Sequence, residues 1–491
     1  MGLWVVSKRK FDVVRVKFML ENALSKSIIR DAVKVEPDGR TRLEHILDDY
    51  INDSHKNRNI LKRIRDYPLR KVIDIVRRAF NRTEEEFKEY LKDRTIRKIL
   101  LLSFKSLDKY GLRTPQWFYS PVMVVWNFTY MCNLRCKHCY EDAGVLRKGK
   151  KDELTLEEKY KVLEELDKEG VPTIFFSGGE PLIHPHFFEI AEEAKKRGFY
   201  ISIATNGTLF ANKEYAERAK EIGFGYIAVS IDSPDPKRHD EFRGVPGMWE
   251  KAVQGIKNLI DVGITTCIQF TLTRQSYKDL PGMFKLLREL GAYKLIVYNY
   301  IPVGRGDFEF DPTPEQREEA FKIMYDQLDM GYHCVASTAP QLARYCIQQG
   351  GDTIIFSHYA DAKAKELGTI AHIVGGCGAG RSYCAIQPDG RLTPCVYMPY
   401  LTIGNLKEKS FRELWEHPIM KEIRDPKGLW GHCAKCEYQA VCGGCRARAY
   451  AYFNDYKGPD PGCILNRKYY YEYMEKNGIP VPEKEEALVT A

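Results

Sequence analysis

The segment CNLRCKHCY, residues 132–140, carries three cysteines directly after an apolar run at Val122–Phe128. Cys132, Cys136 and Cys139 have the spacing C-x3-C-x2-C. Cysteine thiolates are the usual ligands of iron–sulfur clusters, and three of them on one short loop can bind three irons of a 4Fe–4S cluster. The fourth iron then has no protein ligand and can bind a substrate or a cofactor. The pattern therefore predicts a cluster that takes part in chemistry rather than one that only carries electrons.

A zinc site is the alternative for this loop, because His138 together with the three cysteines would complete a Cys3His set. However, His138 directly precedes Cys139, and adjacent residues are awkwardly placed to be two ligands of one tetrahedral ion. The spacing therefore favours iron over zinc.

Apolar runs alternate with amphipathic segments after residue 120. One such segment, Thr155–Gly170, begins with a capping box of Thr155 and Glu158 and ends at a glycine. Strands that alternate with helices form parallel sheets with right-handed crossovers. Six such units predict an α/β fold, a partial (β/α)6 TIM-like barrel with its functional groups at the carboxyl ends of the strands. The expected strands are Val122–Phe128, Thr173–Phe176, Ile201–Ala204, Tyr226–Ile231, Thr266–Leu272 and Lys294–Tyr300.

Polar and glycine-containing motifs follow several of these runs. Residues Ser177–Pro181 read SGGEP, in which the glycines let the backbone approach a ligand and Glu180, with backbone carbonyls, can hold an ammonium group. Thr205–Thr208 read TNGT, and Ser230–Asp232 read SID. Arg243 can clamp a carboxylate in a bidentate pair or form an ion pair with a neighbouring acid of the chain. These motifs predict a ligand-binding site at the strand ends.

Together with Tyr140 after the third cysteine, these motifs resemble those of the radical S-adenosylmethionine (SAM) enzymes. The resemblance implies that Cys132, Cys136 and Cys139 hold the catalytic 4Fe–4S cluster. It also implies reductive cleavage of SAM to a 5′-deoxyadenosyl radical, which abstracts a hydrogen atom from the substrate. The residues expected to contact SAM are Tyr140, Gly178, Gly179, Glu180, Pro181, Asn206, Ser230, Asp232 and Arg243, with Val297, Tyr298 and Asn299 near the adenine.

A second group of cysteines lies near the C-terminus. It follows the patterns C-x6-C-x5-G-x4-C and C-x2-C-x5-C-x2-C, with one further cysteine after a gap. Eight cysteines are enough for two fully ligated 4Fe–4S clusters. Paired C-x2-C units are also signatures of zinc ribbons, so zinc is the alternative for this region taken alone. The eight residues are Cys377, Cys384, Cys395, Cys433, Cys436, Cys442, Cys445 and Cys463.

This second group resembles the SPASM extension of radical SAM enzymes, and the whole resemblance covers residues 120–465. It implies two auxiliary 4Fe–4S clusters with interleaved ligands. The inner cluster would take Cys377, Cys384, Cys395 and Cys445, and the outer cluster Cys433, Cys436, Cys442 and Cys463. With cysteine at all eight positions, neither cluster is expected to have an open iron, and electron transfer is the expected role of both.

Two features depart from the pattern of that family. Cys442 and Cys445 are separated by two residues, where three are more usual. Val396 stands where sulfatase-maturating members carry an aspartate base, which disfavours sulfatase maturation.

The composition divides the chain into five expected parts: a helical basic N-terminal domain at residues 1–115, the barrel core at 116–310, a bridging segment at 311–376, the SPASM-like domain at 377–465 and a polar tail at 466–491. Residues 1–120 hold 28 Lys and Arg against 17 Asp and Glu, whereas the rest of the chain is slightly acidic. This basic character indicates either an anionic partner or solvated helix faces.

Four isolated residues have simpler readings. Cys267 lies in an expected strand and is interpreted as a small core residue. Cys334 and Cys346 lie in the bridging segment, and a structural role is favoured over contact with a substrate. Arg305 follows the sixth strand, where it can reach a substrate carboxylate or stay solvated in a turn.

Composition excludes two broad classes. The 491 residues are 44% hydrophobic and 12% aromatic, which is too apolar for a disordered chain. No stretch approaches the ~18 uncharged apolar residues of a membrane span, and the N-terminus lacks the charge order of a signal peptide. We therefore expect a cytoplasmic protein without a membrane span, in which spaced cysteines bind metal rather than form disulfides.

The sequence leaves the substrate open between two branches of radical SAM chemistry: modification of a peptide or protein, and cofactor biosynthesis, including oxidative decarboxylation in a heme-type pathway. The N-terminal segment is predicted to be helical. Many peptide modifiers begin with a strand-rich recognition domain, so this prediction makes a peptide substrate less favoured. A low-potential donor such as ferredoxin or flavodoxin is the expected redox partner. A non-enzymatic iron–sulfur or zinc protein that binds nucleic acid is the less favoured alternative.

Overall fold

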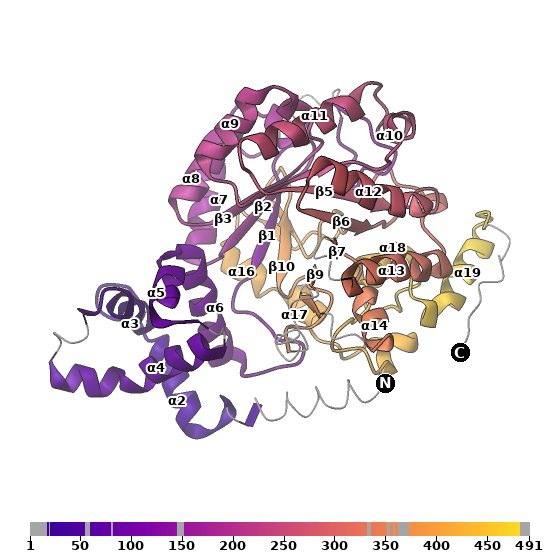
Figure 1. Cartoon of the computed structure of the whole chain (residues 1–491). Helices are drawn as coiled ribbons and strands as arrows, with labels where there is room; N and C mark the ends of the chain where they lie inside the picture. The colour runs from indigo at the N-terminus through magenta and orange to yellow at the C-terminus, as the bar shows by residue number, and fades with distance from the viewer. Residues whose placement is uncertain are drawn as a thin grey trace.

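The computed structural model describes residues 17–18, 20–54, 59–79, 82–144, 152–330, 335–350, 354–356, 359–361 and 373–481. Its centre is one ten-stranded sheet with the strand order β12-β11-β10-β1-β2-β3-β4-β5-β6-β7 (Figure 1). The two outermost strands, β12 and β7, do not pair with each other, so the sheet curves without closing. The predicted partial barrel is therefore confirmed.

The strands from β1 to β6 all run parallel, as the six-unit pattern predicts. Their bounds lie within a residue or two of the expected runs: β1 Met123–Asn127, β2 Thr173–Ser177, β3 Tyr200–Thr205, β4 Tyr226–Ser230, β5 Thr266–Leu272 and β6 Lys294–Asn299. The runs are almost wholly apolar because both faces of each strand are buried, which is typical of a parallel sheet.

The connecting helices cover the outer face of this sheet (Figure 1). They are α7 Leu156–Lys168, α8 Phe187–Lys196, α9 Lys213–Ile222, α10 Pro236–Arg243, α11 Met248–Asp261 and α12 Leu280–Leu290. The capping box predicted at Thr155 and Glu158 is present at the start of α7. Side chains of Trp126, Phe176 and Ile203 are fully buried in the layer between sheet and helices. This layer fixes the strand ends that carry the site.

Both edges of the barrel are extended by later parts of the chain. On one side β7 Val335–Ser337 adds to β6, after α13 Pro314–Asp329 and before α14 Gln341–Gln348. On the other side β10 Tyr383–Ile386 pairs in parallel with β1, and β11 Arg391–Thr393 and β12 Gly404–Asn405 follow antiparallel. A separate hairpin joins β8 Ile354–Phe356 and β9 Tyr359–Asp361.

The cysteine-rich region holds more regular structure than its Gly- and Pro-rich sequence suggests. Besides three strands, it contains α16 Phe411–Trp415, α17 Pro418–Arg424 and α18 Arg446–Phe453. Because β10 is bonded to β1, the first C-terminal cysteines are placed by the barrel sheet itself. The tail contributes α19 Arg467–Lys476, where Tyr470 is fully buried.

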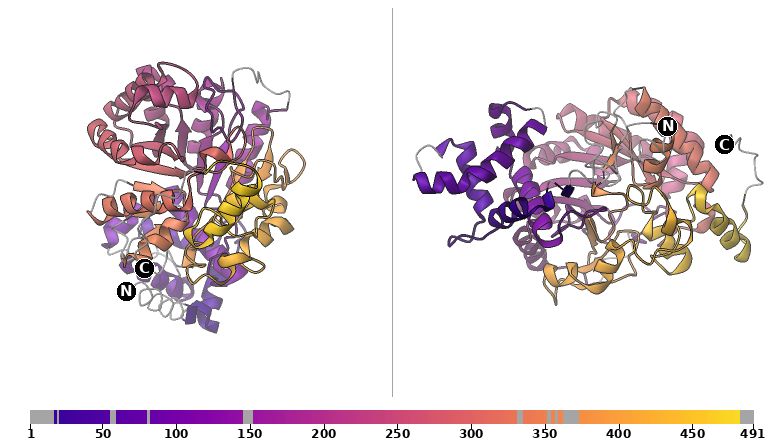
Figure 2. Two further views of the ribbon diagram at one scale, coloured as in Figure 1. Left: turned by 90° about the vertical axis from the view of Figure 1, so that its right-hand side faces the viewer. Right: turned by 90° about the horizontal axis from the view of Figure 1, so that it is seen from below.

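The N-terminal part is helical, as predicted, and gathers at one end of the molecule (Figure 2). Its helices are α2 Ala23–Ala32, α3 Arg42–Ile51, α4 Ile60–Ala79, α5 Glu84–Lys92 and α6 Arg94–Tyr110. They share a small core around Leu47 and Leu91. Pro68 lies inside α4, where it leaves one helical hydrogen bond unformed.

Helix α6 joins this bundle to the barrel. Lys98 Nζ donates to Asp167 at the end of α7, and Lys109 and Tyr110 both donate to Glu416 beside α16. Among the helices of the described residues, none combines the length and the apolar character needed to cross a bilayer.

Candidate active site and cluster-binding cysteines

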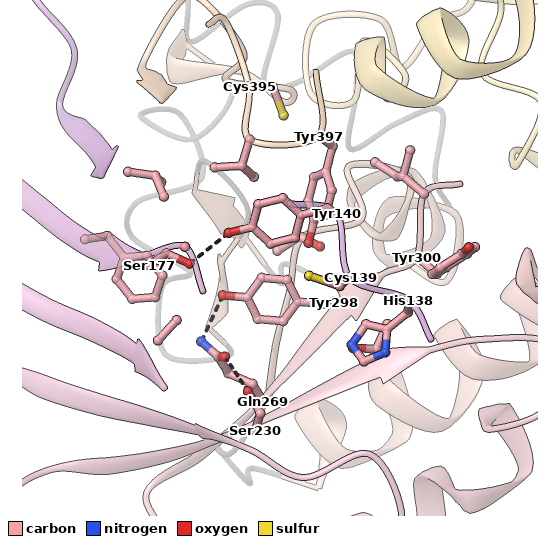
Figure 3. Close-up of a pocket in the computed structure, with 18 of the residues that line it drawn as sticks. His138, Cys139, Tyr140, Ser177, Ser230, Gln269, Tyr298, Tyr300, Cys395 and Tyr397 are labelled. Atoms are coloured by element: carbon pink, nitrogen blue, oxygen red, sulfur yellow. Dashed lines mark hydrogen bonds between the residues drawn. The ribbon is translucent and has the colours of Figure 1, made fainter. Parts of the chain in front are cut away.

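A large cavity lies inside the curve of the sheet, toward the carboxyl ends of its strands. It contains about 1630 Å³ of space that no protein atom fills, counted with its opening to solvent. Strands β1 to β6 line it with residues such as Val125, Phe175, Ser230 and Tyr298. Figure 3 shows Cys139 of the first cysteine loop and Cys395 of the C-terminal group at this one cavity.

Hydrogen bonds from two directions hold the first cysteine loop, which follows β1. The amides of Arg135 and Lys137 donate to the carbonyls of Arg243 and Phe242, at 3.1 and 3.0 Å. On the other side, Arg305 Nε donates to the carbonyl of Cys136 at 3.0 Å. The loop is therefore fixed between the end of α10 and the segment after β6.

All three thiols of this loop line the large cavity, which makes them fit for one cluster. Backbone amides point at two of the sulfurs: Leu134 N lies 3.4 Å from Cys132 Sγ, and Ala143 N lies 3.4 Å from Cys139 Sγ. Such N–H groups stabilise cluster-bound thiolates. Burial raises the pKa of Cys136 to about 11, an effect that a bound cation reverses because thiolates are the ligating form.

His138 does not join this set as a metal ligand. Its ring stacks on Phe242, with centroids 4.4 Å apart, and burial lowers its pKa to about 4. Among the residues that the structure describes, no three His, Cys, Asp or Glu side chains are close enough to hold a single metal ion. Wider spacing is expected around a cluster, where each thiolate binds a different iron.

The two glycines of the SGGEP motif line the cavity. Their backbone lies close to another segment of this chain. A Cβ on Gly179 would lie 2.1 Å from the carbonyl oxygen of Met131, and one on Gly178 would lie 2.9 Å from that of Thr129. The amide of Gly179 donates to Thr129, and that of Glu180 to Met131. The motif therefore sets the start of the cysteine loop against β2, a role that the sequence expectation of ligand approach did not include.

Glu180 and Pro181, two of the residues predicted to contact SAM, are not among the described residues that line the cavity. The carboxylate of Glu180 is fully buried and accepts hydrogen bonds from Thr205 Oγ1 at 2.9 Å and from the amide of Asn206 at 2.8 Å. Burial raises its pKa to about 7, although these bonds oppose the shift. Pro181 begins a 3-10 turn, Pro181–Ile183. Both residues join the ends of β2 and β3.

Asp232 and Arg243 form a buried ion pair, which is the alternative that the sequence left open for Arg243. Arg243 Nε and Nη2 donate to Asp232 Oδ2 at 2.8 and 2.7 Å. Burial opposes ionisation of Asp232, but Arg243, together with His138, His239 and the amide of Thr271, outweighs it and lowers the pKa of the carboxyl to about 2. Arg243 lines the cavity, and its Nη1 lies 3.8 Å from Cys136 Sγ, whereas Asp232 lies behind it.

The remaining expected SAM contacts do line the cavity. Tyr140 donates to Asn127 Oδ1 and lies 2.9 Å from Ser177 Oγ, as Figure 3 shows. Asn206 donates to Asn133 on the cysteine loop, and Ser230 bonds to Gln269 Oε1. Tyr140, Asn206 and Ser230 therefore remain predicted cofactor contacts.

Several lining residues escaped the sequence analysis. Gln269 and Thr271 of β5, Thr338 after β7, and Tyr397 all face the cavity. Gln269 could have been found, because it is a polar residue inside an otherwise apolar strand. Tyr298 was expected near the adenine and lines the cavity, but Val297 points into the core on the other face, as alternation along a strand requires.

The expected outer set of cysteines is gathered around a second, small cavity. Cys433, Cys436, Cys442 and Cys463 all line it, together with Arg344 and Asn466. Asn466 Nδ2 donates to Cys433 Sγ at 3.3 Å, and the amide of Gly444 lies 3.4 Å from Cys442 Sγ. These four thiols fit the ligand set of one cluster.

Only three of the four expected inner cysteines come together. Cys377, Cys395 and Cys445 line the large cavity, but Cys384 does not. Cys384 is the second residue of β10 and is buried in the helix-facing core with Val124. The side chain of its neighbour Tyr383 points to the cavity instead. The structure therefore places Cys384 apart from the other three expected ligands.

The isolated residues have structural roles where the structure describes them. Cys267 is buried in β5 beside Ala228, and Cys346 is fully buried on α14. Cys334 lies outside the described residues. Arg305 bonds to the cysteine loop and to Asp142, so neither reading that the sequence offered, a free substrate clamp or a solvated turn residue, is correct.

Comparison with known proteins gives the same picture. The sequence matches the radical SAM superfamily over residues 126–287 and an iron–sulfur cluster-binding domain over residues 377–446. The AdoMet-dependent heme synthase of Methanosarcina barkeri is 35% identical over 352 residues, 70% of this chain and 97% of that protein. The AdoMet-dependent heme synthase of Nitratidesulfovibrio vulgaris is 32% identical over 347 residues, 70% of this chain and 91% of that protein.

A solved structure agrees on the fold. The crystal structure of Streptococcus suis SuiB bound to S-adenosylmethionine superposes with a TM-score of 0.61 at 17% identity, covering 85% of this chain and 92% of that chain. With the cysteine loop at a cavity inside a partial barrel, and with relatives matched over nearly their whole length, this chain belongs to the radical SAM superfamily of enzymes and carries the iron–sulfur cluster-binding SPASM extension.

Proposed function

We propose that this enzyme acts on a tetrapyrrole and converts a carboxylate side chain to an alkene with loss of CO2, by oxidative decarboxylation. The observation that carries this proposal is the similarity to the two heme synthases, which covers 70% of this chain and nearly all of each relative. The described residues before β1 form helices and no β-strand, which gives no support to the peptide branch.

The lining of the large cavity supports a flat and largely apolar substrate. Five tyrosines line it, together with Phe175 and Pro340. Aromatic rings of this kind stack against conjugated ligands and leave their hydroxyls for hydrogen bonds. The tyrosines are Tyr140, Tyr298, Tyr300, Tyr383 and Tyr397, of which Tyr140 and Tyr397 meet edge to face at 5.3 Å.

In this proposal, side chains around the cavity would hold the cofactors. Cys132, Cys136 and Cys139 would hold the catalytic 4Fe–4S cluster, and SAM would lie beside it against Asn206, Ser230 and Gln269. When bound, this pair supplies a 5′-deoxyadenosyl radical for hydrogen-atom abstraction. The buried Asp232–Arg243 pair keeps a positive group fixed beside Cys136, and the aromatic walls exclude water from the reacting groups.

Two auxiliary clusters complete the proposal. One would be held at the large cavity by Cys377, Cys395 and Cys445, and one at the small cavity by the four cysteines gathered there. Loss of CO2 and a hydrogen atom from a carboxylate side chain leaves one electron to remove. A cluster in the cavity wall is placed to accept it, and a ferredoxin- or flavodoxin-type donor would supply the electron that SAM cleavage needs.

The test uses anaerobically reconstituted enzyme with SAM, dithionite and Fe-coproporphyrin III. We expect 5′-deoxyadenosine to form together with a tetrapyrrole that has lost one CO2 and two hydrogens per side chain, measured by mass spectrometry. Formation of 5′-deoxyadenosine with an unchanged tetrapyrrole would reject the substrate class and move the search to peptides. The Cys136→Ala variant is the control, in which neither product should form.

A further inference from the structure

The two neighbouring residues at the start of β10 face opposite sides of the sheet. Met123 and Val124 of β1 pair with Tyr383 and Cys384 in register. Successive side chains along a strand alternate between the two faces. Tyr383 therefore shares the cavity face with Val125, whereas Cys384 shares the helix-facing core with Val124 and Trp126.

Cys384 is fully buried in that core. Its side chain has no exposed surface, and the charged group near it is Arg424, whose Nε and Nη2 bond to the carbonyls of Gly380 and Trp415. To reach the large cavity, Cys384 would have to exchange faces with Tyr383. Such an exchange needs a one-residue slip of β10 against β1. This slip would also move all the remaining side chains of the strand to the opposite face.

Tyr383 lies on the cavity face beside the three thiols. Its hydroxyl donates to Cys395 Sγ at 2.5 Å, and the thiols of Cys377 and Cys445 also act electrostatically on that hydroxyl. All three thiols and Tyr383 line the large cavity. The amide of Arg448 lies 3.5 Å from Cys445 Sγ, as is usual for a cluster-bound sulfur.

We propose that the inner auxiliary cluster is held by Cys377, Cys395 and Cys445 alone, and that its fourth iron is open toward the large cavity and binds a carboxylate of the substrate. This inference rests on the proposed presence of an inner cluster, and it replaces the sequence expectation of four cysteine ligands. Tyr383 is a positioning residue, because its hydroxyl is engaged with Cys395 rather than free to bind iron.

A carboxylate that enters this cavity meets no unengaged cationic side chain among the described residues that line it. Among the described residues that line it, Arg243 is the one with a permanent positive charge. Its Nε and Nη2 are already taken by Asp232, at 2.8 and 2.7 Å. A carboxylate that enters an apolar, aromatic cavity needs a cationic partner, since an unpaired buried charge is strongly unfavourable. An iron with an open position is such a partner.

The ligand set can be tested by iron content in a background without the first cluster. The triple variant Cys132→Ala/Cys136→Ala/Cys139→Ala should retain both auxiliary clusters, about eight irons per chain. Adding Cys384→Val, a near-isosteric change in the core, should leave that number unchanged, whereas adding Cys377→Ala should remove about four irons. Loss of about four irons with Cys384→Val would overturn the proposal. The absence of iron from the triple variant itself would reject the auxiliary clusters altogether.

The open iron can be tested with two labelled probes on the reduced triple variant. Electron–nuclear double resonance should show a ¹³C coupling from cyanide, and a weaker one from acetate labelled at its carboxyl carbon. Both couplings should disappear in the added Cys377→Ala variant and persist with Cys384→Val. No coupling from cyanide would overturn the proposal, and no coupling from acetate would overturn the carboxylate assignment.

A further variant separates an open iron from one that Tyr383 occupies. With Tyr383→Phe, the cyanide coupling should keep its size within about twofold, because the hydroxyl bonds to sulfur and not to iron. A coupling that is absent in the triple variant and appears only with Tyr383→Phe would show that the phenol is the fourth ligand, and it would overturn the proposal.

Discussion

The large and the small cysteine-lined cavities differ in what surrounds their thiols. The large cavity is lined by two sets of three thiols, together with five tyrosines and the strand ends. The small cavity gathers four thiols, and its other lining residues, such as Asn466 and Gly444, contact the sulfurs or lie next to them. Thus each three-thiol set borders space for a ligand, whereas the four-thiol set is enclosed by its own chain.

This difference indicates a division of labour. A cluster with a missing protein ligand is useful only where a substrate or cofactor can reach it, and a cluster with four ligands is suited to electron transfer. The barrel explains the placement, because parallel strands present their carboxyl ends at one face and β10 adds a strand to that same sheet. Variants that affect one cavity and spare the other test this division of labour.

The largest effect is expected from Cys136→Ala in the large cavity. Removing one of three ligands should prevent assembly of the catalytic cluster and lower the rate of 5′-deoxyadenosine formation by at least about a thousandfold, a loss of about 4 kcal/mol. Cys267→Ala is the matched control, because this buried cysteine of the same barrel lies outside the cavity lining. Cleavage of SAM by Cys136→Ala at the unmodified rate would remove the basis of the family assignment of this loop.

Asp232→Ala should have the next largest effect. The change leaves Arg243 buried without its partner beside Cys136, and breaking a buried pair in this way costs about 3–5 kcal/mol. We expect a fall in the thermal unfolding midpoint of the reconstituted protein, together with weaker retention of the catalytic cluster. Asp326→Ala, which breaks the exposed pair with Lys322, is the control and should change the midpoint little. Equal effects of both changes would contradict the structural role of the buried pair.

The sequence predicts a feature well where residue type and spacing determine it, and less well where packing determines the direction of a side chain. All six strands of the barrel were predicted within one or two residues, because buried parallel strands are continuous apolar runs between glycine-containing turns. The cysteine loop and Tyr140, Asn206 and Ser230 were also found, since motifs at strand ends meet at one edge. The four cysteines assigned to the outer set line one small cavity, and their role as ligands of one cluster stays a prediction.

The failures occur where a side chain could point in either of two directions. Cys384 matches the motif by type, but only the register of β10 against β1 shows that it faces the core. Glu180 and Asp232 have the charge to bind SAM, yet each is used by the chain, one as an acceptor for Thr205 and Asn206 and the other as the partner of Arg243. Spacing identifies candidate ligands, and only the packed structure shows which are already engaged.

Glu180, which is buried behind the lining of the large cavity, predicts a pH dependence of stability. Burial raises the pKa of Glu180 to about 7 from its ordinary value of 4.5, so the native protein keeps a proton that the unfolded chain has lost. Between these pH values the unfolded state binds fewer protons, and the free energy of unfolding should fall as the pH rises, by at most about 3 kcal/mol. Thermal unfolding from pH 4.5 to 8 should therefore show a smaller fall for Glu180→Gln than for the unmodified protein. Equal slopes would show that the hydrogen bonds from Thr205 and Asn206 cancel the effect of burial.

The smallest effect on SAM cleavage is expected from Cys436→Ala, in the small cavity. Cys436 is one of four thiols that line this cavity, and none of the four lines the large one. The variant should lose about four irons per chain. It should nevertheless form 5′-deoxyadenosine from SAM with dithionite within about twofold of the unmodified rate, since the catalytic loop is held by Arg243, Phe242 and Arg305 and not by the small cavity.

Turnover of the substrate should respond differently in the same variant. If the four-thiol set serves electron transfer, product should fall several-fold while 5′-deoxyadenosine continues to form, so the ratio of product to 5′-deoxyadenosine is the quantity to measure. A parallel loss of both would mean that the small cavity supports the fold of the large one, and the two cavities would then not be separable. An unchanged ratio would show that electrons leave through the inner set alone, which would confine the whole reaction to the large cavity.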